Sequence, residues 1–243
     1  MRTDAYLGAA LPVVVLVLLG AAAVNRSPAQ HARVTREGGT FFLGERTMHR
    51  AYTWIDLLAA VGGRFGVRAD AVSWLSLLFG LTAGLVAARG LFGTAAWALA
   101  LSGLCDGLDG AIARRTGTAT PAGAVLDSAL DRYVEFFFCA GLLVHFSGQT
   151  FFQLLVLVTL FGGFMVTYST AKGEALGITP PRGWMKRPER IVWLTAGAAL
   201  SAAGQLLAWP VSHPLVVALA VVALFAHASA VVRLRALIKA TKQ

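Results

Sequence analysis

The chain has 243 residues, of which 57% are hydrophobic and 14% charged, and its mean hydropathy is +0.68. This composition excludes an ordinary soluble domain and indicates a polytopic helical membrane protein. The formal net charge is +9, but the basic residues are spread among the segments between apolar runs. That distribution argues against a nucleic-acid partner and for anionic lipid and the positive-inside rule. Cys105 and Cys139 lie in apolar surroundings, so neither a disulfide nor a cysteine metal site is expected.

The first apolar run, Ala5 to Val24, has the features of either a secretory signal or a true membrane span. Seven arginines follow between positions 26 and 68, and so many positive charges favour retention in the cytoplasm. We therefore predict an uncleaved span with its N-terminus outside. Residues 1–46 would form this span and a basic cytoplasmic stretch, and residues 47–243 the membrane domain. From Thr47 to Phe65 the chain is too polar to span, which predicts an amphipathic helix in the membrane interface.

Six further apolar runs of membrane-spanning length follow. They are Val72 to Ala88, Gly93 to Ala113, Ala124 to Phe146, Phe152 to Tyr168, Ile191 to Trp209 and Pro214 to Val232. The predicted fold is all-α: a six-transmembrane-helix core, one N-terminal transmembrane helix and the interfacial helix. Connections expected outside hold almost no Lys or Arg, whereas those expected inside are basic. This alternation predicts a protein of the cytoplasmic membrane whose C-terminus faces the cytoplasm.

Four aspartates stand at the predicted cytoplasmic ends of two successive helices. Asp106 and Asp109 are three residues apart, and Asp127 and Asp131 are four apart, so each pair lies on one helical face. The short connection with Gly, Thr and Pro predicts antiparallel neighbours whose carboxylates converge. Because charges in a bilayer are costly, hard divalent cations such as Mg²⁺ or Mn²⁺ would stabilise this all-oxygen set. Alternatively, the aspartates are solvated helix-end residues or pair with nearby arginines.

These aspartates belong to a known signature. The pattern D-x2-D-G-x2-A-R-x8-G-x3-D-x3-D of the CDP-alcohol phosphotransferases is met at every fixed position between Asp106 and Asp131. The sequence therefore resembles this family, including its six-helix architecture. The resemblance implies an enzyme that transfers a phosphatidyl group from a CDP-linked lipid, such as CDP-diacylglycerol, to the hydroxyl of a polar alcohol, releasing CMP. It implies two Mg²⁺ or Mn²⁺ ions held by Asp106, Asp109, Asp127 and Asp131, with Asp131 as the base that deprotonates the hydroxyl.

The resemblance also implies a binding region for the CDP-lipid. Its residues would be Asp70, Ser73, Asp106, Asp109, Gly110, Arg114 and Gly123. Gly110 and Gly123 lack side chains and would let the nucleotide approach the helix backbones, while Arg114 could contact a phosphate or pair with an aspartate. Asp70 lies where the family has its nucleotide-binding entry, although Ala69 replaces the family's proline. Helix N-capping is an equally good interpretation of Asp70.

The segment around residues 168–190 resembles the phosphatidylinositol-phosphate synthase branch, in which basic residues bind the phosphate of inositol phosphate. Lys172, Arg187 and Arg190 match basic positions of that branch. The acceptor is therefore expected to be a polyol phosphate, such as inositol phosphate or glycerol phosphate. Thr170, however, stands where the branch usually has another lysine. Ordinary positive-inside charge is the alternative interpretation of the three basic residues.

Two other functions fit part of the pattern. A membrane cation transporter could use the aspartates as its ion site, but the outer halves of the predicted spans are almost purely apolar and offer no path. A degenerate structural relative would have lost a motif position, and none is lost. The family often forms homodimers, so the expected partners are the two substrates, membrane lipid and a second copy of the chain. Glu135, one turn beyond Asp131, is expected to accept a hydrogen bond from Arg132 or a neighbouring helix.

Overall fold

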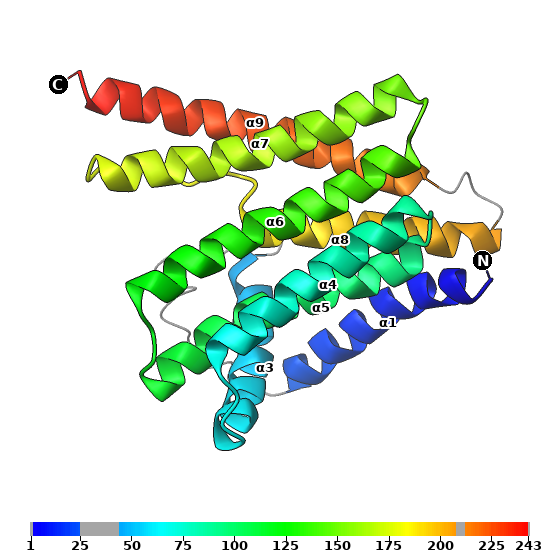
Figure 1. The fold of residues 1–243 in the computed structure, drawn as a ribbon, viewed down its shortest axis with the longest axis horizontal. Helices are drawn as coiled ribbons and strands as arrows, with labels where there is room; N and C mark the ends of the chain where they lie inside the picture. The colour runs from blue at the N-terminus through cyan, green and yellow to red at the C-terminus, as the bar shows by residue number, and fades with distance from the viewer. Residues whose placement is uncertain (1, 25–43, 208–211, 243) are drawn as a thin grey trace.

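The structure is a computed structural model that describes residues 2–24, 44–207 and 212–242 (Figure 1). These residues form α-helices and one short 3₁₀ turn, η1 (Gln205–Leu207), and none of them lies in a β-strand. The helices are α1 (Arg2–Val24), α3 (Gly44–Arg64), α4 (Ala69–Ala88), α5 (Phe92–Thr116), α6 (Pro121–His145), α7 (Thr150–Ala175), α8 (Arg187–Gly204) and α9 (His213–Ala240). The predicted all-α fold is confirmed.

Each predicted membrane segment corresponds to one helix. The largest differences are at the C-terminal ends of α7 and α9, which continue to Ala175 and Ala240, beyond the predicted Tyr168 and Val232. A helix is held by backbone hydrogen bonds and can continue into polar sequence, whereas hydropathy registers only the apolar part. The predicted end of one segment at Trp209 lies outside the described residues.

The helices have the lengths that a bilayer requires. Five of them, α1, α4, α7, α8 and α9, are long and apolar enough to cross a membrane. The helices α5 and α6 have 25 residues each, which is also sufficient to cross a hydrocarbon core of about 30 Å, but they carry the four aspartates. The four aspartates stand toward the joined ends of these two helices. The chain is an integral membrane protein.

Small residues bring the core helices together. The helix α4 packs against α5 and α6, α7 packs against α9, and α8 lies between α5 and α9. A Cβ atom at Gly84 of α4 would collide with the backbone of α6, and one at Gly141 of α6 would collide with the backbone of α4. Such close backbone approach is a principal source of helix association in membranes. The crossing fixes α6, which carries Asp127 and Asp131, against the rest of the bundle.

The first helix packs on the same bundle. The Asp4 carboxylate is buried and accepts hydrogen bonds from the backbone N–H of Gly93 (3.0 Å) and of Thr94 (2.8 Å), which open α5. The indole of Trp97 donates to the carbonyl of Leu7 (3.0 Å). Because the first N–H groups of a helix have no partner within the helix, Asp4 acts as a cap supplied from another helix. The helix α1 contacts α5 and α8 directly. The division of the chain into residues 1–46 and 47–243 stays a prediction from the sequence.

The helix α3 runs across the direction of the other helices, beside the end of α5 (Figure 1). Ala59 is buried, and Ile55 packs so closely on α5 that a Cβ atom at Gly107 would lie 2.9 Å from its terminal carbon. Leu58 and Val61 remain exposed. This orientation and the exposed apolar side chains fit the predicted interfacial helix.

Candidate active site

Three carboxylates converge where α5 ends and α6 begins. Asp106, Asp127 and Asp131 each place one oxygen atom within 4.8 Å of the others, and all three side chains are half-buried. The connection explains this proximity, because Gly117 ends α5 in the left-handed conformation (φ 69°) and Thr120 caps α6. The Thr120 hydroxyl accepts a hydrogen bond from the Gly123 N–H at 3.0 Å.

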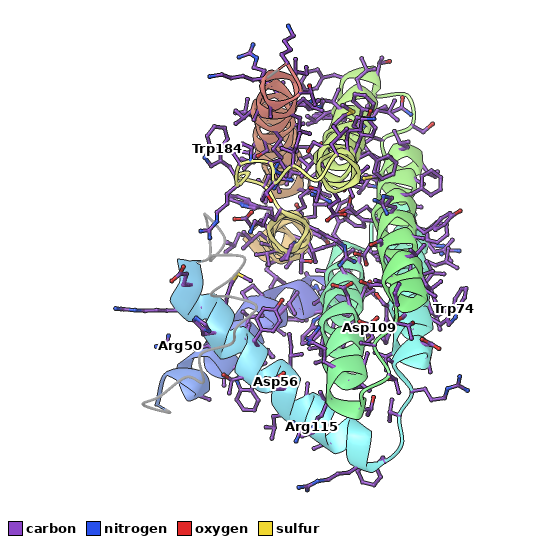
Figure 2. The ribbon with its side chains drawn as sticks, turned by 90° about the vertical axis from the view of Figure 1, so that its left-hand side faces the viewer. Arg50, Asp56, Trp74, Asp109, Arg115 and Trp184 are labelled. Atoms are coloured by element: carbon purple, nitrogen blue, oxygen red, sulfur yellow. The ribbon has the colours of Figure 1, made fainter. Side chains whose placement is uncertain are left out.

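The fourth aspartate has a different partner. Asp109 is buried, and its Oδ2 accepts a hydrogen bond from the Ser73 hydroxyl at 2.5 Å. Figure 2 locates Asp109 within the bundle, whereas Trp74, the next residue after Ser73, lies on its outer surface. The structure thus joins two residues predicted for the same site, but it pairs Ser73 with a carboxylate. Asp109 is oriented by α4, and the other three aspartates face one another.

A guanidinium group bridges the aspartate cluster. Arg187, the first residue of α8, forms ion pairs with Asp106 through Nη1 and with Asp131 through Nη2. The start of α8 is fixed by a capping box, in which the backbone N–H of Lys186 donates to Glu189 at 2.7 Å. The sequence predicted an acceptor-binding role for Arg187. In the structure its contacts are with the predicted metal ligands.

A second ion pair lies one turn deeper. Arg190 donates to Glu135 Oε1 from Nε at 3.1 Å and from Nη2 at 2.5 Å, and both side chains are buried. Gly163 of α7 provides the space, because a Cβ atom there would lie 3.0 Å from Glu135 Oε2 and 3.1 Å from Arg190 Nε. The partner of Glu135 is therefore on a neighbouring helix, one of the two expected alternatives. Arg132 instead donates to the Ser128 carbonyl.

A cavity of about 430 Å³ adjoins the cluster between α6, α7, α8 and α9. Its basic lining residues are Arg132, Lys186, Arg187, Arg190 and Arg233, and its acidic ones are Asp131, Glu135 and Glu174. Asp131 and Arg187 thus belong both to the aspartate site and to the cavity. The arrangement can place an anionic molecule beside the carboxylate cluster.

Sequence reasoning missed Arg233. Its Nη1 donates to the Thr170 hydroxyl at 2.7 Å, so an arginine of α9 reaches the position where the related branch usually has a lysine. Arg233 is only 7% exposed, which separates it from a solvated charge. In the sequence it stands among basic residues that fit the positive-inside rule, and no spacing links it to the aspartate motif. The feature that marks Arg233 as part of the site is its burial, which the sequence alone does not show.

Other predicted residues lie farther from the cavity. Lys172 is exposed and does not line it. Asp70 is exposed in the first turn of α4, whose N-cap is Arg68, so the N-capping interpretation of Asp70 is wrong. The guanidinium of Arg114 lies over Gly110, because a Cβ atom at Gly110 would be 3.1 Å from Arg114 Nη1. Arg114 itself is exposed beyond the cluster.

The donor set fits a hard divalent cation. Asp106, Asp127 and Asp131 offer only carboxylate oxygens, and Mg²⁺ and Mn²⁺ prefer such ligands. Half-burial leaves room for water and substrate oxygens to complete the coordination. A bundle of membrane-spanning helices with this cluster beside a basic cavity defines an integral-membrane, metal-dependent enzyme for phosphorus-containing groups.

The comparison with protein families defines the class more closely. The CDP-alcohol phosphatidyltransferase profile matches residues 67–232, and the chain belongs to this family. The family and the enzyme class predicted from the aspartate motif are therefore confirmed, which favours the enzyme over the cation transporter. The helices α1 and α3 precede the matched region.

Similar proteins come from archaea and mycobacteria. The archaetidylinositol phosphate synthase of Aeropyrum pernix is 43% identical over 104 residues, which cover 42% of this chain and 52% of that protein. The phosphatidylinositol phosphate synthase of Mycobacteroides abscessus is 35% identical over 164 residues, or 63% of this chain and 71% of the relative. The matched segment therefore spans about half of the first relative and more than two thirds of the second.

Solved structures of a mycobacterial relative share the fold. The Mycobacterium tuberculosis phosphatidylinositol phosphate synthase in complex with manganese and citrate has a TM-score of 0.67 and 28% identity, and the match covers 74% of this chain and 87% of that one. The same synthase with CDP-DAG bound has a TM-score of 0.64 and 28% identity, with 74% and 92% covered. The manganese in the relative agrees with the predicted divalent cofactor.

Proposed function

We propose that the chain transfers a phosphatidyl group from CDP-diacylglycerol to a hydroxyl of a polyol phosphate and releases CMP. Inositol phosphate is the first candidate acceptor, and glycerol phosphate is the second. We call the aspartate cluster the donor half of the site and the basic cavity the acceptor half. The single observation that carries this proposal is that the two halves share two residues, since Asp131 and Arg187 contact each other and both line the cavity. A donor held at the cluster and a phosphorylated acceptor in the cavity would meet at Asp131.

The donor half would bind the pyrophosphate of the CDP-lipid. Asp106, Asp109, Asp127 and Asp131 would hold two divalent ions, which supply charge neutralisation and polarise the phosphorus when bound. The Ser73 hydroxyl would hold Asp109 in orientation. The residues proposed beside the nucleotide are Asp70, Gly110, Arg114 and Gly123. Arg114 lies over Gly110 and would have to move for a nucleotide to approach that backbone.

The chemical step requires one bond to form and one to break. The acceptor hydroxyl oxygen would attack the phosphorus that bears the diacylglycerol, and the bond from that phosphorus to the CMP oxygen would break. Asp131 would take the hydroxyl proton, because it lies at the boundary between the two half-sites. Its ion pair with Arg187 holds the carboxylate at that boundary.

The acceptor half would recognise a phosphate by charge. Lys186, Arg187 and Arg233 line the cavity, and charge-assisted hydrogen bonds to phosphate are stronger than neutral ones. Arg190 is already committed to Glu135 and would contribute mainly through its position. Lys172, which the resemblance implied for this phosphate, is exposed and does not line the cavity.

We also propose the cytoplasmic membrane as the location, with this site at the cytoplasmic face. The basic residues of the connection between α7 and α8 support that orientation. A homodimer in the membrane remains part of the proposal, on the basis of the family resemblance.

The test is release of CMP by the purified full chain in lipid nanodiscs. CDP-diacylglycerol and Mg²⁺ or Mn²⁺ would be supplied with inositol phosphate, glycerol phosphate, free inositol or free glycerol. We expect turnover with a phosphorylated polyol and little with its unphosphorylated counterpart. Equal turnover of both would contradict the acceptor assignment, and cation flux into sealed vesicles without any CMP release would support the transporter instead.

A further inference from the structure

Two arginines on α8 pair with two acids on α6 in successive turns. Arg187 pairs with Asp131, and Arg190 pairs with Glu135 one turn deeper. The surroundings of the two pairs differ. The Arg190 and Glu135 side chains are 4% and 8% exposed, whereas Arg187 and Asp131 are 18% and 19% exposed. The shallower pair also involves carboxylates of the metal-binding cluster, and the deeper pair does not.

The two arginines also differ in how firmly they are held. Arg190 has two hydrogen bonds to one oxygen of Glu135. Within the part of the chain that the structure describes, the buried Nε and Nη2 atoms of Arg187 have no hydrogen-bond partner of good geometry. Arg187 is therefore held by ion pairs to two carboxylates, Asp106 and Asp131, while part of its guanidinium lacks a directed hydrogen bond. Its side chain also lines the cavity, so a shift away from the aspartates would leave it facing the acceptor.

Arg187 and a divalent cation would seek the same carboxylates. A metal ion bound between Asp106 and Asp131 would lie beside the guanidinium, and like charges at such short distances repel strongly. The ion would also draw on the oxygen lone pairs that now attract Arg187. Because of both effects, we expect Asp106 and Asp131 to bind either the Arg187 guanidinium or a divalent metal ion, but not both at once.

We propose that Arg187 is an exchangeable counter-cation, which neutralises Asp106 and Asp131 until divalent metal binds and then turns into the cavity to contact the acceptor phosphate. Arg190 keeps its contact with Glu135 throughout. This inference rests on the proposed function, since it assumes the metal and acceptor sites described there. It goes beyond that function by coupling them. Metal binding must overcome the Arg187 contacts, and the released guanidinium strengthens phosphate binding.

The first experiment measures Mn²⁺ affinity of the full chain in nanodiscs by electron paramagnetic resonance, without substrate. In Arg187→Gln, which keeps a hydrogen-bonding polar group but is shorter and loses the charge, we expect Mn²⁺ to bind roughly 10- to 100-fold more tightly than in the unmodified protein, within the usual range of coupling between sites. Arg132→Gln is the matched control, because Arg132 lines the same cavity but donates to a backbone carbonyl. It should change the affinity far less.

The second experiment measures binding of inorganic phosphate by calorimetry, with and without Mg²⁺. We expect Mg²⁺ to strengthen phosphate binding in the unmodified protein and in Arg132→Gln, and to lose that effect in Arg187→Gln. Arg187→Lys cannot bridge two carboxylates in the same way, so its Mg²⁺ effect on phosphate binding should lie between those of the unmodified protein and Arg187→Gln. This variant replaces Arg187→Gln in the test if the glutamine variant does not fold.

The outcomes separate this inference from the function on which it rests. Equal or weaker Mn²⁺ binding by Arg187→Gln would overturn the exchange, and CMP release by the unmodified protein would leave the proposed function standing. Equal tightening in Arg132→Gln would also overturn it, because general charge removal would explain the change. Absence of Mn²⁺ binding in every variant would overturn both the exchange and the proposed metal site.

Discussion

The two halves of the site are built in different ways. The aspartate half comes from two consecutive helices and lies within residues 106–131, joined by a four-residue connection between α5 and α6. The basic half is drawn from α6, α7, α8 and α9, with lining residues from Ser128 to Arg233. A site made within one helical hairpin keeps its spacing in the sequence. A site assembled from four helices depends on how those helices pack, and its residues have no fixed spacing.

Among the substitutions considered, we expect the largest loss of turnover at Asp131, where the aspartate half and the basic half of the site meet. Asp131→Asn keeps the size of the side chain but removes the charge and nearly all basicity. We expect turnover to fall by roughly 10²- to 10⁴-fold, the usual range for loss of a general base. Binding of CDP-diacylglycerol should survive better than in Asp106→Asn, because Asp106 is proposed chiefly as a metal ligand and Asp131 also as the base. Measured turnover and lipid affinity in both variants would check this, and normal turnover of Asp131→Asn would remove it from the mechanism.

The next effect tests whether the aspartate half extends to α4. Ser73→Ala removes the hydroxyl that donates to Asp109. Loss of a group that orients a metal ligand typically costs about 10- to 100-fold in metal affinity or activity, and we expect a decrease in that range. Titration of Mn²⁺ would measure it. Ser76→Ala is the control, since Ser76 hydrogen-bonds to Ser102 on the same two helices.

The basic half is tested by contrasting a buried with an exposed cation. Arg233→Gln should raise the KM for the phosphorylated acceptor by about 10- to 100-fold, because a hydrogen bond to a charged group contributes about 1.5–3 kcal/mol. The KM for CDP-diacylglycerol should change little. Lys172→Gln should have a much smaller effect on both, because Lys172 is exposed and does not line the cavity. A larger increase in the acceptor KM for Lys172→Gln than for Arg233→Gln would contradict this prediction and favour Lys172, the residue implied by the family resemblance, as the phosphate ligand.

The smallest effect lies outside both halves. Asp4→Ala removes the cap on α5 at the end opposite to the aspartates. Loss of a helix cap costs about 0.5–2 kcal/mol of stability, so thermal unfolding in nanodiscs should occur at a lower temperature. The KM for both substrates should stay within about twofold, since a cap is expected to act on stability alone. A large change in KM would indicate that α1 also positions the site.

Much of the fold was predictable because hydropathy and helix length are local properties. The aspartate half was predictable for the same reason, since spacings of three and four residues place Asp106 with Asp109, and Asp127 with Asp131, on one face of each helix. The partners of Arg187 and Arg190 were not. A long basic side chain at a helix end satisfies the positive-inside rule whether it faces water, a phosphate or a carboxylate, so charge alone does not identify its partner. Only packing distinguishes buried Arg233 from exposed Lys172.

The buried Asp4 also affects the order in which the protein is assembled. Asp4 is synthesised 89 residues before Gly93, which it contacts, and at roughly 5–20 residues per second this separation takes about 5–20 s. During that interval the carboxylate has no helix to cap. A charge in hydrocarbon is costly, so nascent α1 should hold Asp4 in the aqueous interface until α5 arrives. Docking of the first helix would then be a late event in biogenesis, and slower translation would prolong the unpaired state.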